Sequence, residues 1–469
     1  MKRAKLEKRG GPGLRARSKR LAAWPVVVVV TCATVGLFVW KTWKAGGTRS
    51  PATSQKTSTN KSPITLNTAL PEPEQDRALR SEQLQVAEKL LVEFPQNDDV
   101  VYLAGLVRNE QGDSEAAMKL WQRSLELDPT RADAHESLGY ALLLRDEYEK
   151  AEGHFRKALE LDPRLQTARF RLAAALSHQG RFSEVISLLE KAGSLSAEAY
   201  RLLGDSCQHV KQTEKAIASF EAAIELKPDF TEAYYGLSKA CAQLGQSARA
   251  SECWEKFLAL KQESDAAERE KRTRFAPLQI TRRSVAQTHT DVGRVYASLG
   301  RTGDAEQLWL RANALDPENT ICRLNLAVFY QRAGQYGEAL QFYEEIARID
   351  PNDALVHLNL GRASLKLNQV ERAERAFAEV IRLAPNQPEG HSALAQLYVQ
   401  GGRNPAEAVR LAETAVRLAP DAQYLALLSE ARARNGDRQG ALTAINQAID
   451  LQPGNGQYQQ MRQMLLGRK

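Results

Sequence analysis

The feature that most constrains this 469-residue chain is a short phrase that recurs, most often every 34 residues. It reads LELDP at 125–129 and 159–163, IELKP at 224–228, ALDP at 314–317, IDP at 349–351, RLAP at 382–385 and 417–420, and LQP at 451–453. Between these phrases apolar residues follow a helical period twice, and the proline of each phrase ends the second helix. The break between the two helices falls near Gly112, Gly180, Gly245, Gly300, Gly334 or Gly436. Because one helical hairpin cannot bury its own apolar faces, neighbouring hairpins are predicted to stack around a continuous core.

Three positions within the repeated units carry residues of one kind. The eighth position is small, as Gly105, Gly139, Ala173, Gly204, Gly293, Ala327 and Gly361. Twelve positions later the residue is alanine, as Ala117, Ala151, Ala216, Ala250, Ala305, Ala339 and Ala373. Four positions beyond it the residue is aromatic, as Trp121, Phe155, Phe220, Trp254, Trp309, Tyr343 and Phe377. Such a pairing is expected where two helices approach closely, because one must present no bulk where the other fills the space.

With this pattern the chain resembles the tetratricopeptide repeat family over nine or ten units, from about residue 98 to about residue 455. The resemblance implies an all-α fold, a right-handed superhelical solenoid of helical hairpins. The aromatic residues are then packing residues, including Trp121, Trp254 and Trp309.

Departures from the repeat divide the predicted solenoid. We expect a first array at 98–261, a charged insert at 262–285, and a second array at 286–455. A lone leading helix is predicted at 74–97, and a capping helix at 456–469 covers the last apolar face. The first part of the insert is expected to extend the preceding helix into solvent.

An apolar segment is predicted to anchor the chain in a membrane. Residues 21–40, LAAWPVVVVVTCATVGLFVW, contain no charged residue, and as a helix they span about 30 Å, the thickness of a bilayer's hydrocarbon core. With the interfacial Trp43 included, we assign a transmembrane helix to 21–43. A cleaved signal peptide is the alternative, but Trp43 makes a poor small-x-small cleavage site before Ala45.

The flanking charges predict the orientation of this anchor. Nine Lys or Arg residues precede it in the basic tail at 1–20, and five follow within a similar distance. Because positive residues resist transfer across the membrane, the tail is expected in the cytoplasm and the repeats on the far side, the periplasm in a bacterium with two membranes. The intervening residues 44–73, rich in Ser, Thr and Pro, are predicted to be a disordered tether.

The net charge of +7 does not indicate nucleic-acid binding. Residues 1–61 carry fourteen Lys or Arg against the single Glu7, so the remaining residues are mildly acidic. A nucleic-acid surface needs a surplus of cations to neutralise phosphates. We therefore expect no nucleic-acid partner.

Histidine and cysteine side chains are possible ligands of a metal or haem. His135, His289, His357 and His391 share the fourth position of their units and are interpreted as packing residues, whereas His178 and His209 share the thirteenth position, from which a metal or haem could be held in principle. No carboxylate or thiol matches that pair, so no metal and no cofactor is expected. Cys207, Cys241, Cys253 and Cys322 are interpreted as core residues, with a Cys241–Cys253 disulfide left open as an alternative.

No catalytic motif is present, and no stretch outside the repeats is long enough to form a catalytic core, so the chain is predicted not to be an enzyme. We interpret it as a membrane-tethered protein-interaction scaffold that serves envelope assembly, secretion or biogenesis. Two alternatives are a structural subunit of a permanent membrane complex and a regulatory partner of a separate enzyme such as a glycosyltransferase.

The resemblance also implies where a partner binds. In the family, positions two, five, six, nine, twelve and thirteen of the first helix line a concave surface that holds peptides, often with Asn at position six. Asn325 and Asn359 match that feature, although an asparagine there can equally be solvated. The predicted groove also contains Arg294, Arg332, Arg362, Lys366, Leu324 and Leu358. Its mostly cationic lining on an acidic body favours a protein or peptide partner with an acidic segment.

Overall fold

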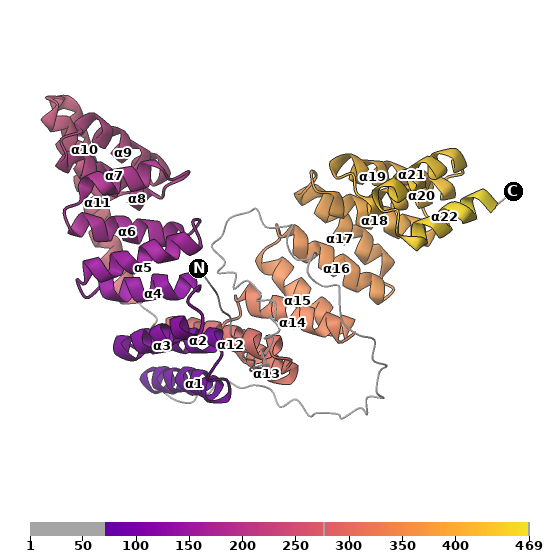
Figure 1. Cartoon of the computed structure of the whole chain (residues 1–469), viewed down its shortest axis with the longest axis horizontal. Helices are drawn as coiled ribbons and strands as arrows, with labels where there is room; N and C mark the ends of the chain where they lie inside the picture. Colours follow the sequence, from indigo (N-terminus) through magenta and orange to yellow (C-terminus); the bar gives the residue numbers. More distant parts are fainter. Residues whose placement is uncertain (1–70, 275–276, 468–469) are drawn as a thin grey trace, which may run out of the picture. The chain divides into compact units, whose positions relative to one another are not determined.

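The computed structural model describes residues 71–274 and 277–467, and within these ranges all regular structure is helical. Helix α1 is followed by ten helical hairpins and a last helix (Figure 1). Consecutive hairpins pack on one another from α2 to α11 and again from α12 to α21, whereas α12 packs on α1 and not on α11. This confirms the predicted all-helical solenoid. The helices are α1 (Glu72–Glu93), α2 (Asp98–Glu110), α3 (Ser114–Leu127), α4 (Ala132–Leu143), α5 (Tyr148–Leu161), α6 (Gln166–His178), α7 (Phe182–Glu190), α8 (Ala197–His209), α9 (Thr213–Leu226), α10 (Thr231–Gln243), α11 (Ser247–Arg274), α12 (Pro277–Ser298), α13 (Thr302–Leu315), α14 (Thr320–Arg332), α15 (Tyr336–Ile349), α16 (Ala354–Lys366), α17 (Val370–Leu383), α18 (Pro388–Gly401), α19 (Pro405–Leu418), α20 (Ala422–Arg434), α21 (Arg438–Leu451) and α22 (Gly456–Gly467).

The loop inside each hairpin needs a left-handed backbone residue. Gly112 has φ of 83° between α2 and α3, and the other five predicted break glycines also have positive φ. Asp146, Lys211 and Asn368 take the equivalent place in three hairpins, with φ between 57° and 60°. Glycine adopts this conformation without a steric cost, which explains its frequency at the break.

Between hairpins, polar side chains cap the next first helix. Asn97, Ser196, Asn319, Asp353 and Asp421 each accept a hydrogen bond from a backbone N–H in the first turn of the helix that follows. Such caps satisfy backbone donors that have no partner inside the helix, and each contributes about 0.5–2 kcal/mol. The sequence therefore specifies the start of five of the ten described hairpins locally.

The closest contact within a hairpin joins the small eighth position to the aromatic residue of the second helix. A Cβ atom placed on Gly139 would lie 2.9 Å from Cε1 of Phe155, and one placed on Gly204 would lie 2.7 Å from Cε1 of Phe220. Phe155 and Phe220 are fully buried. The predicted pairing of small and aromatic residues is therefore observed as direct contact.

Helix α1 is not the lone helix that the sequence predicted. It packs along α12, which lies about two hundred residues later in the chain, and also against α2. Leu79 lies in one core cluster with Leu278 and Val285 of α12, and Leu90 lies in another with Val292. The repeat pattern gave no sign of this contact because α1 lacks the small and aromatic repeat positions.

Polar contacts fix α1 against its neighbours. The side chain of Gln83 is buried, and its Nε2 donates to Thr288 Oγ1 at 2.9 Å and to Glu110 Oε2 at 2.6 Å. Glu82 accepts two hydrogen bonds from Arg311, both at 2.8 Å, and lies 3.1 Å from the buried His289. Burial alone would raise the pKa of Glu82, but the hydrogen bonds from Arg311 and His289 outweigh it and lower the pKa to about 2. Glu82 therefore stays charged at neutral pH and holds α1 to α12 and α13.

Helix α11 continues through the first part of the predicted insert and ends at Arg274. Pro277 opens α12, as proline is tolerated in the first turn of a helix. Among the described helices, only α10 packs along α11. As a result Trp254, predicted to be a packing residue, is 43% exposed, and this expectation was wrong.

In residues 71–274 and 277–467 no helix is long and apolar enough to cross a membrane. The predicted tail at 1–20, transmembrane helix at 21–43 and most of the tether at 44–73 lie outside the described residues. The membrane anchor therefore stays a prediction.

Two glycines of neighbouring helices provide a matched stability test. Gly139→Leu is expected to destabilise the second hairpin by about 1–3 kcal/mol, because the side chain must displace Phe155. Gly153→Leu in α5 meets no atom within 4 Å and should instead stabilise by up to about 1 kcal/mol, since leucine is the better helix former. Hydrogen exchange measured for each helix detects both changes in stability.

The loss of protection in Gly139→Leu should be confined to α4, α5 and the adjacent hairpins, since repeats contact only their neighbours. Equal loss in α20 and α21, or destabilisation by both substitutions, would contradict this packing.

Candidate functional site

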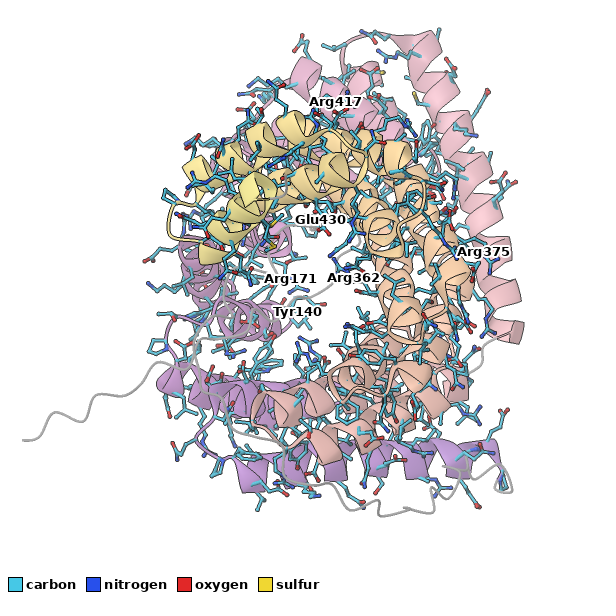
Figure 2. The ribbon with its side chains drawn as sticks, turned by 90° about the vertical axis from the view of Figure 1, so that its right-hand side faces the viewer. Tyr140, Arg171, Arg362, Arg375, Arg417 and Glu430 are labelled. Atoms are coloured by element: carbon cyan, nitrogen blue, oxygen red, sulfur yellow. The ribbon has the colours of Figure 1, made fainter. Side chains whose placement is uncertain are left out.

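The predicted groove residues lie on the first helices of the second array. We call the side formed by α12, α14, α16, α18 and α20 the inner face. Figure 2 shows Arg362 of α16 on the inner face, whereas Arg375 of α17 and Arg417 of α19 point to the opposite side of the second array. Residues of successive first helices can therefore contact one extended ligand.

Asn325 and Asn359 occupy equivalent places on α14 and α16, one hairpin apart. Both side chains are half-buried, and neither makes a hydrogen bond to any residue from 71–274 or 277–467. The Nδ2 atom of Asn325 is buried without an acceptor. A buried donor without a partner costs about 1–3 kcal/mol, so a ligand carbonyl that reached it would recover that free energy.

The four predicted cations differ in their surroundings. Arg362 and Lys366 are exposed one turn apart on α16, and neither forms an ion pair within the described part of the chain. Arg294 is half-buried and pairs with Asp291 at 3.1 Å, so its charge is already balanced. Burial raises the pKa of Asp291, although a hydrogen bond from Gln287 and the charge of Arg294 oppose the rise. The uncompensated positive charge of the inner face is therefore on α16.

Arg332 of α14 also belongs to this positive region. Burial raises the pKa of Tyr343 to about 12, and the charges of Arg362 and Arg332 act in the opposite direction. Both guanidinium groups are thus close enough to the Tyr343 phenol to affect it. Arg332, at the end of α14, therefore lies near the same phenol as Arg362.

The two predicted leucines contribute less to the inner face than expected. Leu358 is 5% exposed and belongs to the core shared with α17, α18 and α20, and Leu324 is half-buried against the core around Tyr330. The apolar residue that the sequence reasoning missed is Leu355, which is 54% exposed at the second position of α16. Position two is one of the positions that line the groove in the family, and this could have identified Leu355 from the sequence.

In the first array the equivalent polar positions are paired with one another. Arg171, at the sixth position of α6, lies 4.0 Å from the centre of the Tyr140 ring and donates to Glu136 at 2.9 Å (Figure 2). On α2 and α4, the Tyr102 hydroxyl and Ser137 lie 3.1 Å apart. These groups satisfy each other, so a peptide would have to displace existing contacts there.

The six histidines considered above have structural surroundings, and the seventh, His154, contacts one of them. His178 stacks on Tyr148 with ring centres 4.8 Å apart, and His209 stacks on Phe182 at 4.1 Å. The ring nitrogens of the other four contact His154 Nδ1 (His135), Glu82 (His289) and the carbonyl oxygens of Pro351 (His357) and Pro385 (His391). No group of three or more potential metal ligands occurs within 71–274 and 277–467.

Cys207, Cys241, Cys253 and Cys322 are all free and buried, so the alternative of a Cys241–Cys253 disulfide is not realised. Burial raises the pKa of each thiol, to about 12 for Cys322. These cysteines are therefore unreactive core residues.

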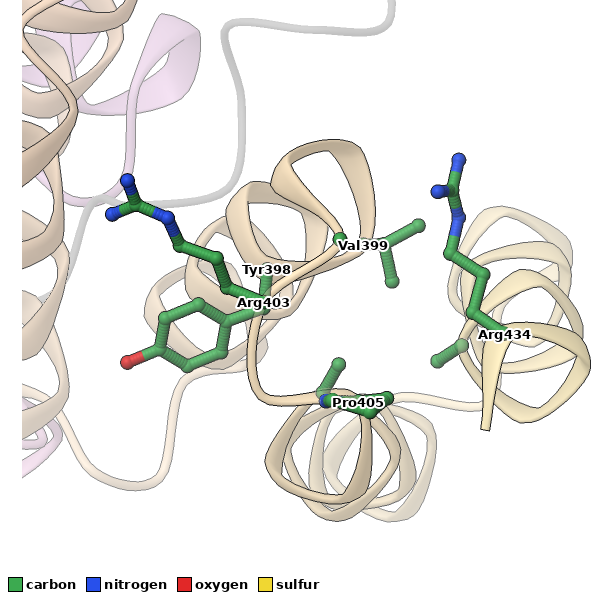
Figure 3. Close-up of a pocket in the computed structure, with 8 residues that line it drawn as sticks. Tyr398, Val399, Arg403, Pro405 and Arg434 are labelled. Atoms are coloured by element: carbon green, nitrogen blue, oxygen red, sulfur yellow. The ribbon is translucent and has the colours of Figure 1, made fainter. Parts of the chain in front are cut away.

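A small pocket of about 200 Å³ lies between α18, α19 and α20. Figure 3 shows Arg403 and Arg434 on opposite sides of Val399, with Pro405 at the start of α19 nearby. Arg434 pairs with Glu430 at 3.3 Å and Arg403 lies 3.6 Å from Glu371, so both cations have carboxylate partners. The pocket lies beside the loop at 401–404, and its described polar side chains all have partners.

Comparison with known families identifies the repeats. Models described as tetratricopeptide repeat match residues 102–166, 197–230, 231–264, 291–354, 330–397 and 392–456, which together cover more than half of the chain. The chain is a tetratricopeptide repeat protein. It is accordingly a protein-interaction scaffold of the tetratricopeptide type, and proteins of this kind are generally non-catalytic adaptors.

Curated tetratricopeptide relatives are similar over parts of their length. The chain is 28% identical over 210 residues to the DnaJ homolog subfamily C member 7 homolog of Dictyostelium discoideum, covering 40% of this chain and 38% of that protein. It is 27% identical over 199 residues to stress-induced-phosphoprotein 1 of Caenorhabditis elegans, covering 42% of this chain and 55% of the relative. The chain thus spans about half or less of the curated relatives it matches.

Two solved structures are similar to this chain at low sequence identity. Yeast Tom70 is 16% identical, with 84% of this chain and 96% of that chain covered and a TM-score of 0.33. YrrB, described as a TPR protein with an unusual peptide-binding site, is 20% identical, with 38% and 92% covered and a TM-score of 0.35.

Proposed function

We propose that this tetratricopeptide protein is a membrane-tethered scaffold whose second array binds an extended peptide with acidic side chains across α14 and α16. The observation that carries the proposal is the pair Asn325 and Asn359, whose amides make no hydrogen bond within the described residues, beside the exposed cations Arg362 and Lys366. By binding such segments the scaffold gathers partners for an envelope process such as assembly, secretion or biogenesis.

The spacing of these groups suits an extended ligand. Asn359, Arg362 and Lys366 follow one another at intervals of three and four residues and therefore share one side of α16. Asn325 lies at the same position of α14, so the two amides can each bind a backbone group of one peptide that crosses both helices. Leu355, exposed at the start of α16, adds an apolar contact on the same helix.

Charge supports an acidic partner at this place. Arg332, Arg362 and Lys366 are exposed on α14 and α16, while the repeats as a whole are mildly acidic. A local positive region on an acidic body attracts a negatively charged segment and disfavours a positive one. Farther along the inner face Glu430 of α20 pairs with Arg434 at 3.3 Å, so its charge is balanced.

Removing the two amides tests the binding site. Asn325→Ala with Asn359→Ala is expected to weaken a peptide selected on the parent protein by roughly 1–3 kcal/mol, about 5- to 150-fold, since desolvated hydrogen bonds are lost. The fold should remain intact because neither side chain is hydrogen-bonded within the array. Fluorescence anisotropy titration measures the affinity, and Asn352→Ala, in an exposed loop before α16, is the matched control.

The cations provide a second comparison at constant net charge. Arg362→Ala with Lys366→Ala should lower the affinity by about 0.2–1 kcal/mol per side chain and reduce its dependence on salt. Arg375→Ala with Arg417→Ala removes two charges from the opposite side of the array and should leave the affinity unchanged. If the Asn325–Asn359 double variant and the Arg362–Lys366 double variant both bind as the parent does, the inner face of the second array is not the binding site.

The membrane tether is tested by protease accessibility. In spheroplasts, added protease is expected to digest the repeats and to spare a tag at residue 1, because the flanking charges favour a cytoplasmic tail. Repeats that remain protected from the added protease would contradict the predicted orientation and place the repeats in the cytoplasm. A purified protein that starts near Ala45 would identify the segment as a signal peptide.

A further inference from the structure

An exposed aromatic surface lies at the end of the first array. We call it the α10–α11 face and define it by Tyr235, Trp254, Phe257 and Leu258. Tyr235 and Trp254 are each 43% exposed and Leu258 is 41% exposed. The three rings contact one another, with centres 6.1 Å apart for Tyr235–Trp254, 5.4 Å for Tyr235–Phe257 and 5.0 Å for Trp254–Phe257.

Trp254 occupies a position that is buried in other hairpins. The equivalent aromatic residues are at most 5% exposed: Trp121, Phe155, Phe220, Trp309, Tyr343 and Phe377. In the preceding hairpin, Phe220 of α9 lies against Gly236 of α10, the first helix of the next unit. The first helix of a following hairpin therefore completes the burial of the aromatic residue.

No described helix takes that place beside α11. Helix α10 is the only one that packs along it, because α12 packs with α1 and α13 instead. The α10–α11 face thus continues the interface through which successive hairpins stack. No described helix packs on it. Exposed aromatic clusters of this kind are typical of protein-binding surfaces.

We propose that the α10–α11 face binds an amphipathic helix of a partner protein, in the place that the first helix of another hairpin would take. The inference is independent of the peptide site proposed above, which lies on α14 and α16. It adds a second interaction surface, on the first array.

The contact between α9 and α10 shows how a partner helix can pack on the α10–α11 face. A Cβ atom on Gly236 would lie 2.5 Å from Cε1 and Cζ of Phe220, so in this hairpin the covering helix reaches the aromatic ring through a glycine. A partner helix with glycine or alanine at that place can approach Trp254 as closely. Larger apolar residues on the same side then pack on Phe257 and Leu258.

Two lysines define the charge of the partner helix. Lys239 lies over the Tyr235 ring at 5.3 Å, and Lys261 lies over the Phe257 ring at 5.8 Å. Both side chains are exposed, and neither forms an ion pair with a carboxylate of the described residues. Carboxylates at the edges of the apolar stripe of the partner helix complement these two cations.

A pair of synthetic helices tests the proposal on the full chain in detergent micelles. The first is a 20-residue amphipathic helix with alanine at the centre of its apolar stripe, leucine on either side and glutamate along both edges. The second has lysine in place of each glutamate. We expect the acidic helix to bind at least tenfold more tightly than the lysine helix by fluorescence anisotropy.

Two variants and a control assign the binding to this face. Leu258→Arg should weaken the acidic helix at least tenfold, while Leu144→Arg, at a 68% exposed site after α4, should not. Lys239→Glu with Lys261→Glu should reverse the preference in favour of the lysine helix. Circular dichroism confirms that each variant is folded.

Several results would overturn the proposal. These are no binding of the acidic helix, equal binding of both helices, or binding that Leu258→Arg leaves unchanged. Sedimentation velocity that shows a dimer lost in Leu258→Arg would identify a second copy of the chain as the occupant. Amide protection of α10 and α11 in the free full chain as strong as that of α8 and α9 would show that the chain already covers this face itself.

Discussion

The contact between an aromatic ring and a small residue on the facing helix is the interaction on which this structure depends. Where Phe155 meets Gly139 and Phe220 meets Gly204, the two helices of a hairpin approach closely and leave one apolar side for the next hairpin. Repeating the contact produces a row in which each hairpin completes the core of its neighbour. The same requirement leaves Trp254 exposed, because no described helix follows α11 in the row.

A contact between two helices distant in sequence, α1 and α12, starts a second row of hairpins. Helix α1 packs on α12 through Leu79 and Leu90, and the charged Glu82 and buried Gln83 satisfy polar groups of α2, α12 and α13. Helix α12 therefore begins a second array whose first apolar side is already covered. The first array keeps its open end at α11, so the two arrays offer different surfaces to partners.

The hairpins, their glycine breaks and the aromatic pairing followed from the sequence, because each depends on residues within one repeat of each other. The α1–α12 contact did not, because Leu79 and Gln83 carry no periodic signal that identifies a partner two hundred residues away. Asn325 and Asn359 were identified by their position in the repeat. Only the structure distinguishes Arg362 and Lys366, which form no ion pair with any described residue, from Arg294, which pairs with Asp291. Packing between repeats decides whether a side chain in the groove is already paired with a neighbouring residue.

The central claim is that the inner face of the second array binds a partner while the equivalent positions of the first array do not. Photo-crosslinking side chains introduced at Leu355 and at Thr167 test it directly, since both occupy the exposed second position of a first helix, in α16 and α6. In intact membranes the account predicts a discrete protein adduct at position 355 that is lost when Arg362 and Lys366 are changed to alanine, and none at position 167. An adduct at position 167 alone, or one at position 355 that survives loss of both cations, would contradict it.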